Sequence, residues 1–318
     1  MQTYLDFEKP VADLEGKIVE LKSLSSTDQA VSIDEEVSRL SARAEEALIE
    51  IYRKLTPWQR TQVARHPQRP HFSDYAKALF TEWQPLAGDR KFAEDAAIQA
   101  GFARIDGQVI AVLGQEKGNS TESRLKHNFG MARPDGYRKA VRIMEMADRF
   151  NIPLIAFVDT AGAYPGIGAE ERGQAEAIAR STEKCLELGV PNLALVIGEG
   201  GSGGAIAIAT ANRVLMLENA IYSVISPEAG ASILWRDAGK AQEAANNMKI
   251  TAPDLLGFGV IDGVIPEPPG GAHRHPQKVF DETRAAIGTF LKDFEGRGRL
   301  ELREHRREKF LAIGTNLG

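Results

Sequence analysis

Cysteine and long hydrophobic runs are what this chain most obviously lacks. Cys185 is its single cysteine, which excludes an internal disulfide and a zinc site built from cysteines. No apolar stretch approaches the roughly 18 residues that a membrane-spanning helix needs, and residues 1–8 show no signal-peptide pattern. The sequence therefore predicts a cytoplasmic protein without a membrane span.

A strong excess of charge of one sign is missing as well. With 39 Lys and Arg against 44 Asp and Glu, the net charge is −5, which gives no reason to expect a nucleic-acid partner. The 6 histidines show no zinc-binding spacing, so we expect no metal in this chain. A Gly-Lys-Ser/Thr sequence is also absent, which excludes a P-loop.

What the sequence does have is glycine, concentrated in two turns. The first extends from Asp159 to Gly168 and the second from Gly198 to Gly204. Each turn follows a short apolar run (residues 153–158 and 192–197) that is typical of a strand buried on both faces, and each precedes a stretch with helical sequence. Two strand–turn–helix units in succession predict a parallel or mixed α/β core.

These turns also suggest a kind of chemistry. A glycine-rich turn before a helix exposes backbone N–H groups at the helix N-terminus, where negative charge is stabilised. Such donors stabilise a developing oxyanion without any acidic, basic or metal-binding side chain. We therefore expect an enzyme whose active site is built from its backbone.

The second turn also fits the fingerprint of an NAD-dependent oxidoreductase. Gly198-x-Gly200-x-x-Gly203 matches the dinucleotide-binding pattern, and Glu218 lies about 20 residues further on, where an acid that binds ribose is expected. The unit comes late in the chain for such a fold, after at least one complete strand–helix unit. Short patterns match easily in a run so rich in glycine, and this interpretation stays open as an alternative.

A serine hydrolase is the other alternative. Gly200-x-Ser202-x-Gly204 matches the nucleophile elbow, and His273 and His275 follow as possible bases. Both histidines belong to a loop rich in proline and glycine, and the sequence offers no convincing acid to complete a triad. The pattern alone does not decide between these readings.

Longer strings carry a family resemblance. They are Gly198-Glu-Gly-Gly-Ser-Gly-Gly-Ala205, Asp159-Thr-Ala-Gly-Ala-Tyr-Pro-Gly166, Gly168-Ala-Glu-Glu-Arg-Gly-Gln174, Tyr222-Ser-Val-Ile-Ser-Pro-Glu228 and Ala231-Ser-Ile-Leu-Trp235. Together they closely resemble the alpha subunits of bacterial acetyl-CoA carboxylase carboxyltransferases. The resemblance covers nearly the whole chain and fades beyond about Gln277. One departure is Ala161, which replaces a proline that is usual in the first turn.

The resemblance implies a crotonase-like α/β fold of repeated β-β-α units with helical extensions at both ends. We place a helical N-terminal arm at residues 1–90, the carboxyltransferase core at 91–265 and a helical C-terminal tail at 266–318. Members of the family are active only with a beta subunit, in an α2β2 carboxyltransferase. The resemblance implies that this beta subunit carries zinc.

Local patterns fit this architecture. Apolar residues recur at helical spacing over residues 33–55, and Ser32 with Glu35 predicts a capping box at the start of that helix. Thr56-Pro57 predicts the N-cap and first residue of the next helix. Asp106-Gly107 lies between two apolar runs and predicts a β-hairpin.

The reaction that the resemblance implies is a carboxyl transfer. Carboxybiotin on a separate biotin carboxyl carrier protein supplies the carboxyl group, and acetyl-CoA accepts it to form malonyl-CoA for fatty acid synthesis. A partner biotin carboxylase uses ATP to load the biotin. The leaving biotin and the deprotonated thioester both carry negative charge on oxygen, which backbone donors are suited to stabilise.

The resemblance also implies the site residues. The backbone N–H groups of Gly203 and Gly204 are expected to form an oxyanion hole, for the biotin carbonyl rather than the thioester. Ser202 is expected to cap the following helix, and a valine at Gly204 is expected to abolish transfer while leaving assembly intact. Carboxybiotin is expected to contact Gly162, Ala163, Tyr164, Pro165, Gly166, Gly201 and Ser202.

Overall fold

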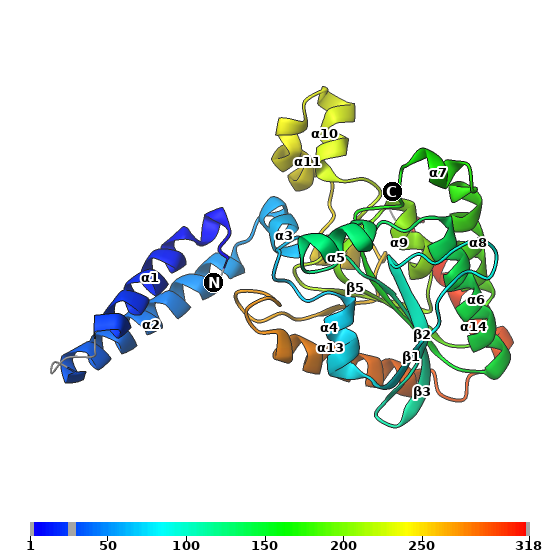
Figure 1. Ribbon diagram of the computed structural model, residues 1–318, viewed down its shortest axis with the longest axis horizontal. Helices are drawn as coiled ribbons and strands as arrows, with labels where there is room; N and C mark the ends of the chain where they lie inside the picture. The colour runs from blue at the N-terminus through cyan, green and yellow to red at the C-terminus, as the bar shows by residue number, and fades with distance from the viewer. Residues whose placement is uncertain (1–2, 25–29, 316–318) are drawn as a thin grey trace.

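A mixed β-sheet organises the molecule (Figure 1). The computed structural model describes residues 3–24 and 30–315, and within them the sheet has eight strands in the order β1-β2-β3-β4-β5-β6-β8, with β7 paired to β5. The strands are β1 (Thr81–Pro85), β2 (Ile98–Ile105), β3 (Gln108–Gln115), β4 (Leu154–Thr160), β5 (Asn192–Gly201), β6 (Arg213–Leu217), β7 (Ile221–Ser223) and β8 (Gly263–Ile265). The predicted α/β class is confirmed.

Strand directions divide the sheet into two parts. β1, β2 and β3 pair in antiparallel fashion, whereas the pairs from β3 through β8 are parallel. The predicted hairpin joins β2 to β3, with Ile105 opposite Gln108 and positive φ angles of 48° at Asp106 and 84° at Gly107. Positive φ at both central residues is what a tight two-residue hairpin turn requires.

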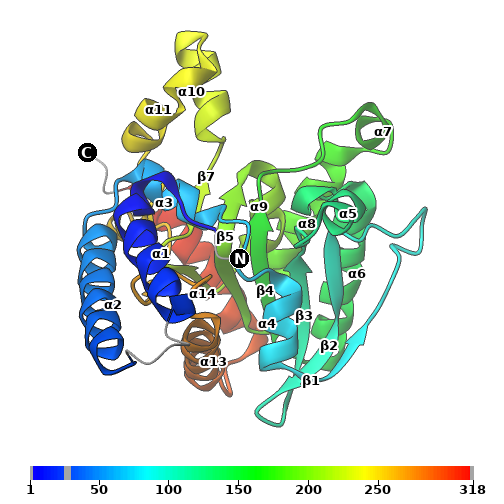
Figure 2. The ribbon, with the colours of Figure 1, turned by 60° about the vertical axis from the view of Figure 1, so that its left-hand side comes forward.

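Helices cover both faces of the sheet. α6, α8 and α9 pack on one face, and α4 and α13 on the other (Figures 1 and 2). The helices are α1 (Lys9–Leu24), α2 (Ala30–Arg53), α3 (Pro57–Ala64), α4 (Phe72–Leu79), α5 (Thr121–Lys126), α6 (Pro134–Phe150), α7 (Ile167–Glu170), α8 (Gln174–Glu187), α9 (Ser202–Ala209), α10 (Pro227–Trp235), α11 (Ala241–Asn247), α12 (Ala252–Gly257), α13 (Pro276–Asp293) and α14 (Arg299–Ala312). No helix of the described residues is long and apolar enough to cross a membrane.

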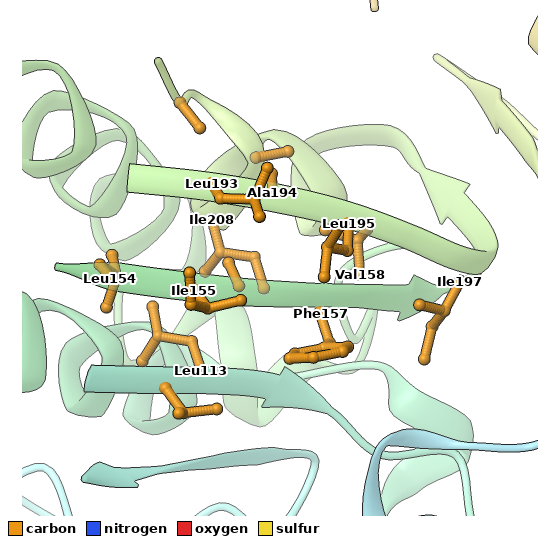
Figure 3. Packing of buried hydrophobic residues seen from close by; sticks show 14 of the residues in the cluster. Leu113, Leu154, Ile155, Phe157, Val158, Leu193, Ala194, Leu195, Ile197 and Ile208 are labelled. Carbon is orange, nitrogen blue, oxygen red and sulfur yellow. The ribbon is translucent and has the colours of Figure 1, made fainter. Parts of the chain in front are cut away.

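The core lies between these layers. Every residue of β4 and β5 is buried, as expected for parallel strands covered on both faces. Figure 3 shows Leu113, Phe157 and Leu195 on three neighbouring strands, and all three belong with Ile208 of α9 to one cluster of buried residues. This packing holds the carboxyl ends of β4 and β5, and the turns that follow them, in a fixed relation.

The N-terminal helices form a hairpin that extends to one side (Figure 1). α1 and α2 pack together through a separate apolar cluster that includes Val11 and Leu48. As predicted, Thr56 caps α3 and Pro57 is its first residue. The capping box predicted at Ser32 is wrong, because α2 already begins at Ala30 and Ser32 lies inside the helix.

The main core also takes residues from both predicted extensions. β1 lies within residues 1–90 yet pairs with β2, and Tyr75 of α4 is fully buried in the main cluster. Phe290 of α13, in the predicted tail, belongs to the same cluster. The segments outside residues 91–265 thus contribute to the same continuous core. The limits at residues 90 and 265 stay predictions.

Candidate active site at two glycine turns

The two glycine turns follow adjacent strands. β4 and β5 pair in parallel, from Leu154 opposite Asn192 to Thr160 opposite Gly200, so their carboxyl ends lie side by side. β5 continues through Gly201, and α9 begins at the next residue. Residues 198–201 are therefore strand, and the second turn is sharper and shorter than its sequence predicts.

The backbones of the two turns touch. A Cβ atom added to Gly204 would lie 2.6 Å from the carbonyl carbon of Gly162 and 2.9 Å from the nitrogen of Ala163. A Cβ atom at Gly201 would lie 2.2 Å from the carbonyl oxygen of Ala161. Only residues without a side chain fit at these two positions, so glycine here permits close packing of the turns.

Two backbone donors of the first turn are bonded within the protein. The Gly162 N–H donates to Thr160 Oγ1 at 3.1 Å, and the Tyr164 N–H donates to the Ala132 carbonyl at 3.0 Å. Pro165 has no N–H to offer. The Gly162 and Tyr164 N–H groups are therefore not available to an anion.

The second turn leaves its donors available. Gly203 and Gly204 lie in the first turn of α9, where N–H groups have no acceptor within the helix. Gly201 occupies the N-cap position, and no side chain of the described residues caps this end. The positive end of the helix dipole adds to the attraction for an anion.

A cavity of about 430 Å³ lies next to these donors. Its walls are mainly apolar, and Gly203, which is half-buried, is part of them. The lining residues are Ser202, Gly203, Ile206, Tyr222, Ser223, Val224, Met248, Lys249, Ile250, Leu255 and Val260. An anionic oxygen held in such surroundings interacts more strongly with N–H donors than it would in water.

Tyr164, in the first turn, is held by packing on both sides of its ring. The Arg133 guanidinium lies 4.6 Å from the centre of its ring. On the other side, a Cβ atom at Gly166 would lie 2.3 Å from Tyr164 Cε1, so the ring packs directly on this glycine. The ring is half-buried and is fixed by these contacts.

The comparisons with known proteins give this site a family. The family described as "Acetyl co-enzyme A carboxylase carboxyltransferase-like" matches residues 4–314. The acetyl-coenzyme A carboxylase carboxyl transferase subunit alpha of Rhizobium rhizogenes is 68% identical over 317 residues, covering 100% of both chains. That of Xanthobacter autotrophicus is 67% identical with the same coverage. The chain belongs to the family of acetyl-CoA carboxylase carboxyltransferase alpha subunits. Membership implies a beta partner chain and carboxybiotin as a substrate.

Solved structures share the fold at lower identity. A Pseudomonas malonate decarboxylase hetero-tetramer in complex with coenzyme A aligns with a TM-score of 0.59 and 19% identity, over 77% of this chain and 92% of that chain. The transcarboxylase 12S hexamer with methylmalonyl-coenzyme A bound aligns with a TM-score of 0.57 and 21% identity, over 74% of this chain. The match spans 44% of the transcarboxylase chain. The predicted crotonase-like fold is confirmed.

Beneath the turns of this alpha-type subunit lies a buried network of charges. Lys117 Nζ lies 2.9 Å from Asp159 Oδ1 and 3.3 Å from Glu199 Oε2. Arg65 Nη2 lies 2.6 Å from Glu199 Oε1, and His71 Nδ1 lies 3.1 Å from Asp159 Oδ2. Burial acts to raise the pKa of Asp159, but the opposing charge of Lys117 and the contact with His71 hold it below its usual value.

Asp159 and Glu199 connect this network to the turns. Asp159 accepts the Glu199 N–H at 3.0 Å and so braces the turns, whereas Glu199 accepts from the side chains of Arg65 and Lys117. Arg65 and His71 are close in the chain, but they are far from Lys117 and from the turns that they contact, and no local spacing connects these groups. No group of three or more metal-binding side chains occurs in the described part of the chain.

The geometry does not support a serine hydrolase. Ser202 has a positive φ of 52°, as a strained elbow would, but among the described residues no histidine lines the cavity beside it. His273 stacks instead on His66 with ring centres 3.7 Å apart, and burial lowers the pKa of His273 to about 2. The expectation that Ser202 caps α9 is also wrong, since Gly201 is the N-cap.

The dinucleotide-binding alternative is not supported either. Gly198 and Gly200 belong to β5 and not to a phosphate-binding loop, because Gly200 pairs with Tyr222 of β7. The Glu218 carboxylate accepts the Glu267 N–H at 3.1 Å. Gly198 and Gly200 therefore serve strand pairing and close packing.

Proposed function

We propose that this chain provides the biotin side of a carboxyltransferase active site. Its substrate is carboxybiotin, and the carboxyl group passes to acetyl-CoA to give malonyl-CoA for fatty acid synthesis. The observation that carries the proposal is the position of Gly203 in the wall of an apolar cavity of about 430 Å³, with its N–H group and that of Gly204 in the uncapped first turn of α9. Gly162, Ala163, Tyr164, Pro165, Gly166, Gly201 and Ser202 would contact the carboxybiotin.

The chemistry requires oxyanion stabilisation twice. When the carboxyl group leaves the ureido nitrogen of biotin as CO₂, the electron pair of the broken bond delocalises onto the ureido oxygen. The biotin anion then accepts a methyl proton of acetyl-CoA, and the carbanion that remains attacks CO₂. One preorganised donor contributes about 2.7–4 kcal/mol in studied cases, so two N–H groups are an adequate device for the first charge.

Several partners follow from this proposal. A beta subunit carrying zinc would complete the site in an α2β2 assembly and would bind acetyl-CoA. A biotin carboxyl carrier protein would deliver the carboxybiotin, and a biotin carboxylase would use ATP to form it. The single cysteine, fully buried in α8, is compatible with a reducing cytoplasm, where we place the protein.

Reconstitution tests the proposal. The chain is co-expressed with a candidate beta subunit, and the complex is assayed for decarboxylation of malonyl-CoA in the presence of biocytin. We expect turnover from the complex and none from either chain alone. An assembled complex without turnover, or full turnover from this chain alone, would contradict the proposal.

A further inference from the structure

The amide of Gln115 connects the end of β4 to the first turn of α9. Gln115 is the last residue of β3, and its side chain is completely buried. Its Nε2 donates to the Gly204 carbonyl at 2.7 Å, and its Oε1 accepts the Asp159 N–H at 3.1 Å. The amide therefore bridges the end of β4 and the helix that presents the donors.

The first turn of α9 has few other restraints. It begins with Ser202 in a positive-φ conformation and continues with two glycines, which have more backbone freedom than any other residue. No side chain of the described residues caps it. The backbone of Gly204 also packs closely against that of Gly162. Among the described residues, the Gln115 amide makes the one side-chain hydrogen bond that reaches residues 202–205 of this turn.

We infer that Gln115 is a positioning residue for the oxyanion hole. It fixes the rotation of the first turn of α9, and with it the directions of the Gly203 and Gly204 N–H groups, without touching the substrate. The inference rests on the proposed function. Because preorganised donors act only when they already point at the developing charge, their misalignment lowers kcat rather than substrate binding.

The test compares two buried side chains that donate to carbonyls of the same helix. Gln115→Met keeps an unbranched side chain of similar length and removes both amide hydrogen bonds. The matched control is Ser181→Ala in α8, because Ser181 is also fully buried and its Oγ donates to the Ala207 carbonyl of α9 at 2.6 Å. Each variant is assembled with the beta chain, and kcat, KM and the melting temperature are measured in the biocytin assay.

We expect Gln115→Met to lower kcat by about 10- to 100-fold, as small misplacements in active sites do. KM for malonyl-CoA and biocytin should stay within about twofold of wild type. Ser181→Ala should keep wild-type kcat even where its melting temperature falls as much. Equal kcat losses in the two variants, or wild-type kcat in Gln115→Met, would overturn the inference.

A second variant covers the case in which the methionine variant does not assemble. Gln115→Glu has nearly the same shape and still accepts the Asp159 N–H, and its ionised carboxylate faces the Gly204 carbonyl without a proton to donate. Because burial raises the pKa of a carboxyl group, this variant is assayed over a range of pH. It should show the same kcat loss at the alkaline end of the range, and wild-type kcat there would overturn the inference. Absence of turnover in the wild-type complex would instead contradict the proposed function itself, and the two failures are thereby distinguished.

Discussion

The two glycine turns have similar compositions but different hydrogen bonding. In the first turn, the Gly162 and Tyr164 N–H groups donate to Thr160 and Ala132. In the second, the N–H groups of Gly203 and Gly204 have no acceptor within α9. From this difference in hydrogen bonding we expect the first turn to shape a wall of the site and the second to receive negative charge.

The glycines of the second turn also differ in how closely other atoms approach them. Gly204 and Gly201 are required because the opposing turn approaches them closely. At Gly203 an added Cβ atom would meet only Ile178 side-chain atoms, at 3.5 and 3.6 Å, which is ordinary contact. Neighbouring glycines in one motif therefore differ in tolerance to substitution, and the following predictions use that difference.

Gly204→Val should have the largest effect. Its side chain would overlap the Gly162 backbone, since the first added atom already lies 2.6 Å from a carbonyl carbon. Turnover should be lost, and the melting temperature should fall, because overpacking costs about 1–3 kcal/mol even where side chains can adjust. This revises the expectation from sequence that assembly survives. Turnover and thermal unfolding should be measured on one preparation.

Gly203→Ala provides the matched control for that experiment. It should keep a melting temperature close to wild type, because the added methyl group meets only the Ile178 side chain. A Gly204→Val variant with the melting temperature of Gly203→Ala would show that the two turns are not in close contact.

Asp159→Asn should have the next largest effect, on stability. Removing one charge of a buried pair costs about 3–5 kcal/mol, and here it leaves Lys117 and His71 beside a neutral amide. Because the folded pKa of Asp159 lies below the unfolded value of about 3.9, its contribution is fully present above that pH and is lost as the pH falls through the folded pKa. Urea unfolding at pH 7 measures the loss of stability, and the same measurement below pH 4 shows its pH dependence.

The difference in the free energy of unfolding between wild type and Asp159→Asn should therefore become smaller in acid. Lys117→Met is the control, because it removes the positive partner of the pair and leaves the Asp159 carboxylate in place. A free-energy difference that stayed constant between pH 7 and pH 3 would be inconsistent with a lowered pKa for Asp159.

Tyr164→Ala should have a moderate effect, confined to the wall. Its ring packs between the Arg133 guanidinium and Gly166, so its loss removes a surface without removing a donor. We expect KM for biocytin to rise several-fold while kcat changes less, as when binding common to ground and transition states is lost. Tyr164→Phe should behave like wild type. A kcat loss above about 100-fold with unchanged KM would assign Tyr164 a part in the chemistry.

Ser202→Ala should have the smallest effect. Its hydroxyl neither caps α9 nor lies in a cavity lined by any described histidine, so we expect turnover within about twofold of wild type. Ser202→Gly should raise the melting temperature slightly, because φ is 52° at this position and glycine adopts it without strain. A loss of several orders of magnitude in Ser202→Ala at unchanged stability would restore the hydrolase alternative.

Much of this architecture could be predicted from local patterns. The Asp106-Gly107 hairpin and the Thr56-Pro57 helix start each depend on a few adjacent residues, and both are found as expected. The end of β5 could not be predicted, because residues 198–201 remain in the strand through pairing with β7, which comes later in the chain. A run of glycines predicts a turn when the strand that pairs with it is not known.

The site shows the same division between local and distant information. Strand order brings the two turns together, as their position after consecutive apolar runs suggests. The supporting contacts of Gln115, Lys117 and Arg65 were missed, because they join residues 44 to 134 positions apart in the chain. Buried charges and amides of this kind have no periodic signature, and only the packed fold shows which groups they satisfy.

The most direct measurement is a crystal structure of the assembled α and β chains with biocytin bound. The decisive quantity is the distance from the biotin ureido oxygen to each backbone nitrogen of the two turns. We predict that this oxygen lies about 2.7–3.1 Å from the nitrogens of Gly203 and Gly204, with the first turn contacting only the ring. A ureido oxygen bound to the first turn, or to donors of the beta chain alone, would contradict the assignment.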